Sequence, residues 1–158
     1  MAKAEEVDPA PGIGDLLPGA QFIDAYRVTL AGTSLNARDA ARRMFTRPPV
    51  WVSRLLALRN AIVTPLGLKT GRETEGHADR IGMFPVQSAT NDRLVLGFQD
   101  KHLDFRVVVD VSETAGGSAV TATTLVRTHN LFGRSYLAVI LPFHRLIVRA
   151  SLEGMATR

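Results

Sequence analysis

The middle of the chain alternates between short runs of apolar and β-branched residues and short polar segments. Between residues 80 and 128 the runs are RIGMFPV, RLVLGFQ, LDFRVVVDV and SAVTATTLVRT, separated by QSATND, DKH and SETAGG. Runs of this length and composition, bounded by turn-forming residues, predict consecutive antiparallel strands. The segment QFIDAYRVTL at residues 21–30 also alternates and predicts an earlier strand.

The turn at Gly116 and Gly117 indicates how the last two of these strands pair. With Val111 opposite Val120, like residues face each other along both strands, which favours this register. The further pairs are Val109–Ala122, Val107–Thr124 and Phe105–Val126.

The preceding strand continues the same apolar face if Phe98 lies opposite Leu103. One face of the predicted sheet is then apolar throughout and has to be covered. The other face is mainly polar and carries His102, Asp104, Arg106, Asp110, Thr121, Thr123, Arg127 and His129. Val108 and Leu125 leave an apolar spot on this outer face, through which copies of the chain could associate.

Two segments near the first predicted strand have the spacing of helices. Residues 34–45 carry Asn36 as an N-cap, and residues 47–68 carry Pro49 in the first turn and Pro65 at the end. The apolar stripe of the second helix consists of Trp51, Leu55, Leu58 and Ile62 and is widened by Val52, Leu56 and Val63.

Residues 133–154 predict one long helix, which is suited to cover the apolar sheet face. Its apolar stripe consists of Tyr136, Ile140, Phe143 and Ile147. Pro142 cannot donate a backbone hydrogen bond and predicts a kink. Because His144 and Arg145 interrupt the apolar run well before the roughly 20 residues that a bilayer requires, we predict no transmembrane segment.

A chain of 158 residues has the length of one domain with a substantial core. Residues 1–19 are rich in proline and glycine and predict a flexible leader, so the folded domain is expected over residues 20–158. The absence of cysteine excludes disulfides and thiolate metal ligands. The chain opens without the apolar core of a secretory signal, and we therefore expect a cytoplasmic protein.

The net charge of +4 raises the question of an anionic partner. Arg38, Arg42, Arg43 and Arg47 cluster in one short segment, but no aromatic residues interleave with them and no nucleic-acid motif accompanies them. A solvated helix face explains the cluster, and we predict no nucleic-acid partner.

His102, Asp104 and His129 form the sharpest candidate metal set, because two histidines and one carboxylate can bind non-haem iron. Lysine and arginine side chains crowd the same face, and their positive charge would repel a metal cation. A surface ion pair between Asp104 and Arg127 is the interpretation that we favour. The sequence thus predicts no metal and no cofactor.

His144 lies beside the predicted kink and could face a space between helix and sheet. There it could form a hydrogen bond with a ligand or exchange a proton with it. The hydroxyl of Tyr136 could act in either of the same two ways. The sequence spacing does not bring a nucleophile, a base and an orienting group together around either residue. We therefore assign no catalytic residue. Trp51 is either a core residue or a border of the space.

The order of one strand, two helices, several antiparallel strands and a long helix is a helix-grip arrangement of the α+β class. Three segments resemble a bacterial family known as domain of unknown function 2867 (DUF2867): PVWVSRLLALRNAIVTPLGL, LVLGFQDKHLDFRVVVDV and THNLFGRSYLAVILPFHRLIV. That family is similar to the START and birch-pollen-allergen superfamily (SRPBCC), whose members hold lipids, hormones or polyketides between sheet and helix. The resemblance implies a cavity but names no ligand.

The expected function is binding of a small apolar molecule, such as a lipid or a polyketide, between the sheet and the last helix. Two alternatives stay open: a cyclase- or hydratase-like enzyme that uses His144 or Tyr136 as acid–base, and an interaction domain with a filled core. An enzyme is the less favoured reading. The residues expected to bind the ligand are Trp51, Phe98, Phe105, Val107, Val126, Tyr136, Ile140, Phe143 and His144.

Overall fold

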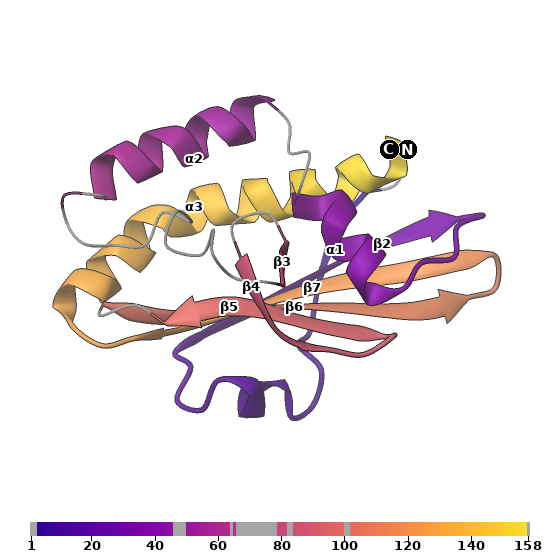
Figure 1. The fold of residues 1–158 in the computed structure, drawn as a ribbon, viewed down its shortest axis with the longest axis horizontal. Coiled ribbons are helices and arrows are strands. Elements are labelled where there is room, and N and C mark those ends of the chain that lie inside the picture. The colour runs from indigo at the N-terminus through magenta and orange to yellow at the C-terminus, as the bar shows by residue number, and fades with distance from the viewer. Residues whose placement is uncertain are drawn as a thin grey trace.

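The fold consists of an antiparallel sheet of seven strands with the α-helices on one face (Figure 1). The structure is a computed structural model, and it describes residues 3–45, 50–63, 65, 79–81, 84–99 and 102–157. The strand order is β1-β2-β7-β6-β5-β4-β3. The strands are β1 (Glu5–Val7), β2 (Phe22–Ala31), β3 (Arg80–Ile81), β4 (Phe84–Ala89), β5 (Arg93–Gln99), β6 (Leu103–Thr114) and β7 (Gly117–Thr128). The helices are η1 (Ile13–Leu16), α1 (Ala37–Phe45), α2 (Val50–Val63), α3 (Leu131–Gly154) and η4 (Met155–Thr157). The predicted α+β, helix-grip architecture is confirmed.

The register of the two longest strands agrees with the sequence pattern. Val111 pairs with Val120, and Phe105 pairs with Val126, as predicted. The predicted register of β5 is wrong by two residues, because Phe98 pairs with Phe105 rather than with Leu103. Since side chains alternate with a period of two, this shift keeps the same residues on the inner face.

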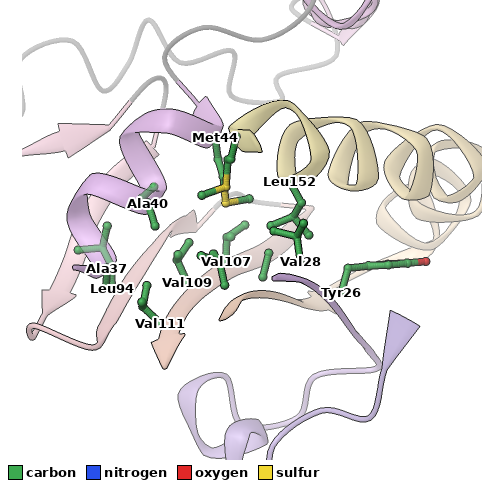
Figure 2. Close-up of a cluster of buried hydrophobic side chains, with 14 of the residues drawn as sticks. Tyr26, Val28, Ala37, Ala40, Met44, Leu94, Val107, Val109, Val111 and Leu152 are labelled. Carbon is green, nitrogen blue, oxygen red and sulfur yellow. The ribbon is translucent and has the colours of Figure 1, made fainter. Parts of the chain in front are cut away.

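Helix α1 covers one end of the inner sheet face at close range. Asn36 caps it, as predicted, because its Oδ1 accepts a hydrogen bond of 2.8 Å from the backbone N–H of Asp39. The helix residues that point to the sheet are small except for one methionine: Ala37, Ala40, Ala41 and Met44, all fully buried. Figure 2 shows these contacts with the valines of the sheet and with Leu152 from the end of α3.

Helix α3 crosses the same face and is visibly curved (Figure 1). It contains Pro142, which cannot donate a hydrogen bond to the preceding turn. Asn130 is the N-cap, and its side chain accepts a 2.8 Å hydrogen bond from the N–H of Gly133. At the opposite end Ser151 and Leu152 are buried, whereas the central turns are half-buried or exposed.

The length and apolar composition of α3 are those of a helix that could cross a membrane, and only 6% of its most apolar window is buried within the structure. A single helix of this kind is weak evidence for a membrane span. That α3 does not cross a membrane stays a prediction.

The segment predicted as a flexible leader is ordered over the residues that the structure describes, from residue 3 onward. Strand β1 pairs with β2 at the sheet edge, and the short helix η1 folds beneath the outer face (Figure 1). Ile13 and Leu17 are buried there against Val95, Val108 and Leu125. The leader therefore covers the apolar spot on the outer face, because burying this spot within the chain removes it from water.

The second helix differs from its predicted stripe. Val52 is buried, whereas Trp51 is 44% and Leu58 is 58% exposed. The side chain of Ile62 lies outside those that the structure describes. Figure 1 shows α2 on the side of α3 away from the sheet, and the Arg59–Tyr136 hydrogen bond joins the two helices. Because α2 does not lie on the sheet, much of its apolar surface stays exposed.

We predict that Leu17→Ala lowers the free energy of unfolding by about 2–5 kcal/mol, because Leu17 is only 4% exposed and fills the outer apolar cluster. Urea unfolding followed by circular dichroism measures the loss. Leu131→Ala is the matched control, since Leu131 is 77% exposed and should change stability by less than about 0.5 kcal/mol. An unchanged stability of Leu17→Ala would mean that the leader is not packed in solution.

Candidate functional site

A cavity of about 560 Å³ lies between α3 and the inner face of the sheet. Side chains from β2, β4, β6 and β7 form its floor, and α1, α2 and α3 supply its walls and roof. The lining is almost entirely apolar and aromatic: Phe22, Met44, Phe45, Leu55, Leu58, Phe84, Leu103, Phe105, Val107, Ala122, Val126, Phe132, Leu137, Val139, Ile140, Leu141, Phe143, Ile147 and Val148. The polar lining residues are few: Arg59, Thr124, Ser135, Tyr136, His144 and Ser151.

The structure brings most of the predicted ligand-site residues together in this lining. Those that line the cavity are Phe105, Val107, Val126, Tyr136, Ile140, Phe143 and His144. Trp51 does not line it, because the cavity side of α2 is formed by Leu55, Leu58 and Arg59. The backbone of Phe98 is described, but its side chain lies outside the described part of the structure.

His144 bonds to a carboxylate that the sequence analysis did not connect with it. Its Nε2 makes a hydrogen bond of 3.3 Å with Oδ1 of Asp24 on β2 and lies 3.2 Å from Oδ2, without hydrogen-bond geometry to the second oxygen. Asp24 is only 7% exposed, and the Phe22 ring packs nearly perpendicular to the imidazole of His144 with ring centres 5.9 Å apart. The pair thus fixes the orientation of an imidazole that faces the cavity.

Asp24 also affects the neighbouring Tyr26 on the same strand. Burial raises the pKa of the Tyr26 phenol, and the Asp24 and Glu6 carboxylates raise it further. Arg149 lies 5.2 Å above the Tyr26 ring and opposes this shift in part. The phenol therefore stays protonated at neutral pH.

A second polar pair joins α2 to α3 at the cavity wall. Nε of Arg59 donates a hydrogen bond of 2.8 Å to the hydroxyl of Tyr136, and the guanidinium carbon lies 5.6 Å from the centre of the tyrosine ring. A further N–H of Arg59 donates to Oδ1 of Asn60 at 2.9 Å. Arg59 was not among the predicted site residues. Helix α2 also carries Arg54, so the sequence pattern does not single out Arg59, and its bond to Tyr136 spans 77 residues of the chain.

The polar outer face is arranged differently from its prediction. Asp104 is cross-strand neighbour to Arg127, but its Oδ1 pairs with Nε2 of His129 at 2.9 Å. Arg127 donates to the carbonyl oxygen of Pro18 at 3.4 Å. The leader accounts for this change, because it covers the face and offers the arginine a backbone acceptor. The predicted Asp104–Arg127 ion pair is therefore wrong.

Burial also affects an arginine on this face. It lowers the pKa of the Arg106 guanidinium, and the Asp104 carboxylate opposes the shift only in part. Nδ1 of His102 lies 3.0 Å from the amide nitrogen of Asn130. Among the described residues, no group of histidine and acidic side chains is arranged to hold a metal ion.

We predict that the purified protein retains no stoichiometric metal and that dialysis against EDTA leaves its melting temperature unchanged. A ring nitrogen of His102 already contacts Asn130 and one of His129 contacts Asp104, and the buried Arg106 interacts electrostatically with the same Asp104 carboxylate. Elemental analysis tests this directly. Stoichiometric metal that is lost in His129→Ala would contradict the prediction.

Comparisons with known proteins place the chain in a family. The family model described as a protein of unknown function (DUF2867) matches residues 16–151, which include the strands and helices that form the cavity. Neither the search of curated proteins nor the search of solved structures found a match. Because the family model covers most of its length, the chain belongs to the DUF2867 family.

Proposed function

We propose that the protein binds a small, mostly apolar molecule in the cavity between α3 and the sheet. The single observation that carries this proposal is the cavity itself, about 560 Å³ of space lined mainly by apolar and aromatic side chains. Ligand pockets of proteins usually have volumes of roughly 300–1,000 Å³ and combine such a lining with a few polar groups.

The energetics support a ligand rather than a permanently water-filled space. Burial of apolar surface is favourable by about 25 cal/mol per Å², so a ligand that buries roughly 300 Å² would gain roughly 7.5 kcal/mol before the cost of association. Several lining side chains of α3, including Val139 and Phe143, are exposed without a ligand. The same volume counts against the alternative of an interaction domain with a filled core.

The helix-grip arrangement gives further support. A relation to the START and birch-pollen-allergen superfamily, a bacterial origin and a cytoplasmic location are parts of the same proposal. The superfamily relation rests on the resemblance of the sequence and on the order of strands and helices, and the bacterial origin rests on the resemblance alone. The cytoplasmic location is carried over from the sequence analysis. The lipid- or polyketide-like class of ligand follows from the resemblance together with the apolar lining.

We predict that fitting apolar compounds raise the melting temperature of the protein, because a ligand that binds only the folded state stabilises it by mass action. A thermal-shift screen of fatty acids, sterols and aromatic polyketides, with native mass spectrometry of co-purified molecules, measures the effect. Ile140→Trp should abolish each hit, since Ile140 lines the cavity and the larger side chain narrows it at the middle of α3.

Leu131→Trp is the matched control for this screen. It introduces the same side chain on the same helix, but Leu131 is exposed and does not line the cavity. This variant should keep every thermal shift. If no apolar compound shifts the melting temperature of the unmodified protein, the binding proposal is wrong.

A second candidate function, acid–base catalysis, is favoured by the His144–Asp24 pair. A carboxylate that bonds to one ring nitrogen orients an imidazole toward the cavity, an arrangement that general bases use. An enzyme of the cyclase or hydratase kind would need such a group to move a proton on a bound carbonyl compound. Tyr136 is less suited, because its hydroxyl already accepts a hydrogen bond from Arg59.

We predict for this candidate that the protein catalyses exchange of the acidic C–H protons of a bound long-chain methyl ketone in deuterated water, measured by mass spectrometry. His144→Gln should lower the exchange rate at least about a hundredfold, the usual contribution of a general base, while ketone affinity stays within a few fold. Exchange no faster than in buffer would exclude this function and leave the binding proposal intact.

A further inference from the structure

The imidazole of His144 has two ring nitrogens, and only one of them has a partner among the described residues. Nε2 is bonded to Asp24, whose ionised carboxylate can only accept hydrogen bonds. Nε2 therefore carries the proton of the neutral imidazole. Nδ1 is left with a lone pair that accepts a hydrogen bond.

Thr124 adds a hydroxyl to the same end of the cavity. It is the direct cross-strand neighbour of Asp24, so its side chain lies on the inner sheet face beside the carboxylate that holds His144. Thr124 and His144 both line the cavity. Within the described part of the chain, neither Nδ1 of His144 nor Oγ1 of Thr124 makes a hydrogen bond, and neither is fully enclosed as Oδ2 of Asp24 is. Both atoms are therefore open to a ligand in the cavity.

These two atoms restrict the polar group that a ligand can place between them. An ether, ester or ketone oxygen only accepts hydrogen bonds, so it would leave Nδ1 without a partner. A carboxylate would bring a second negative charge close to Asp24, which is only 7% exposed. A hydroxyl group both donates and accepts, so it satisfies Nδ1 and the Thr124 hydroxyl together.

We propose that the ligand of this cavity is an apolar alcohol, sterol or phenol, whose hydroxyl donates to Nδ1 of His144 and accepts from the hydroxyl of Thr124. Its apolar body fills the space toward Tyr136, which lies eight residues or roughly 12 Å away along α3. The lining between these two residues includes Ile140 and Leu141. This inference rests on the proposed binding function, and it deepens that proposal by naming the functional group of the ligand.

The experiment compares octanol with its isomer methyl heptyl ether by isothermal titration calorimetry at about pH 8.5, where an ordinary histidine is neutral. The two probes contain the same atoms and nearly the same apolar surface, but only octanol can donate a hydrogen bond. The unmodified protein should bind octanol at least about fivefold more tightly than the ether, the factor that one hydrogen bond of ordinary net strength gives. This preference tests the inference without any variant.

Two substitutions separate the donor from the acceptor role of the ligand hydroxyl. His144→Phe keeps an aromatic ring and removes the acceptor, so it should bring the affinities for octanol and the ether within about twofold of each other. Thr124→Val should weaken both probes by a similar factor, because each of them offers an acceptor oxygen to the Thr124 hydroxyl.

His129→Phe and Thr123→Val are the matched controls. His129 also pairs with an aspartate, Thr123 lies next to Thr124 on β7, and neither residue lines the cavity. Both controls should keep the two affinities of the unmodified protein. Circular dichroism and the melting temperature confirm that each variant is folded.

The outcomes separate the inference from the function on which it rests. Equal affinities of octanol and the ether for the unmodified protein would overturn the hydroxyl-bearing ligand and leave the apolar binding site in place. A preference for octanol that persists in folded His144→Phe would place the acceptor elsewhere and overturn the inference as well. A failure of both probes to bind to the unmodified protein would overturn the binding function together with the inference.

Discussion

The long helix α3 is held against the sheet at its two ends, and the space between these ends is the cavity. At its start Gly133 lies so close to β6 that a Cβ on it would overlap the carbonyl oxygen of His102. At its end Leu152 and Met155 are buried with α1 against the sheet. Because the helix curves around Pro142 and the sheet is twisted, the two layers cannot stay in contact along their whole length.

The same constraint places the polar groups of the cavity. His144 on α3 meets Asp24 on β2, and Tyr136 on α3 meets Arg59 on α2. Each pair joins the long helix to a different neighbour, so the position of α3 sets the geometry of both. Both pairs connect α3 to its neighbours and place polar atoms in the lining of the cavity.

The two faces of the sheet differ in how their apolar residues are covered. Ile13 and Leu17 of the N-terminal segment cover Val108 and Leu125 on that face. The N-terminal segment therefore covers the apolar spot of the outer face, whereas the helices cover the inner face only in part and leave the cavity. Association through the apolar spot of the outer face, which the sequence suggested, would require this segment to move away.

The sequence by itself determined the elements whose signals are local or periodic. A period of two gave the inner and outer faces of β6 and β7, the Gly116–Gly117 turn gave their register, and Asn36 gave the start of α1. The apolar stripe of residues 133–154 gave the helix that carries Tyr136, Ile140, Phe143 and His144, and thereby much of the candidate site.

The features that depend on contacts between distant parts of the chain could be seen only in the tertiary structure. The register of β5 shifted by two residues, a change that the side-chain period cannot detect. Residues 3–19 became a cover for the outer face because a partner for Leu17 exists only once β5, β6 and β7 lie side by side. The bonds of His144 to Asp24 and of Arg59 to Tyr136 span separations of 120 and 77 residues. Helical and strand periodicities relate only residues that are close in the sequence. Residues this far apart become neighbours only when the chain folds, so the sequence pattern could not predict these bonds.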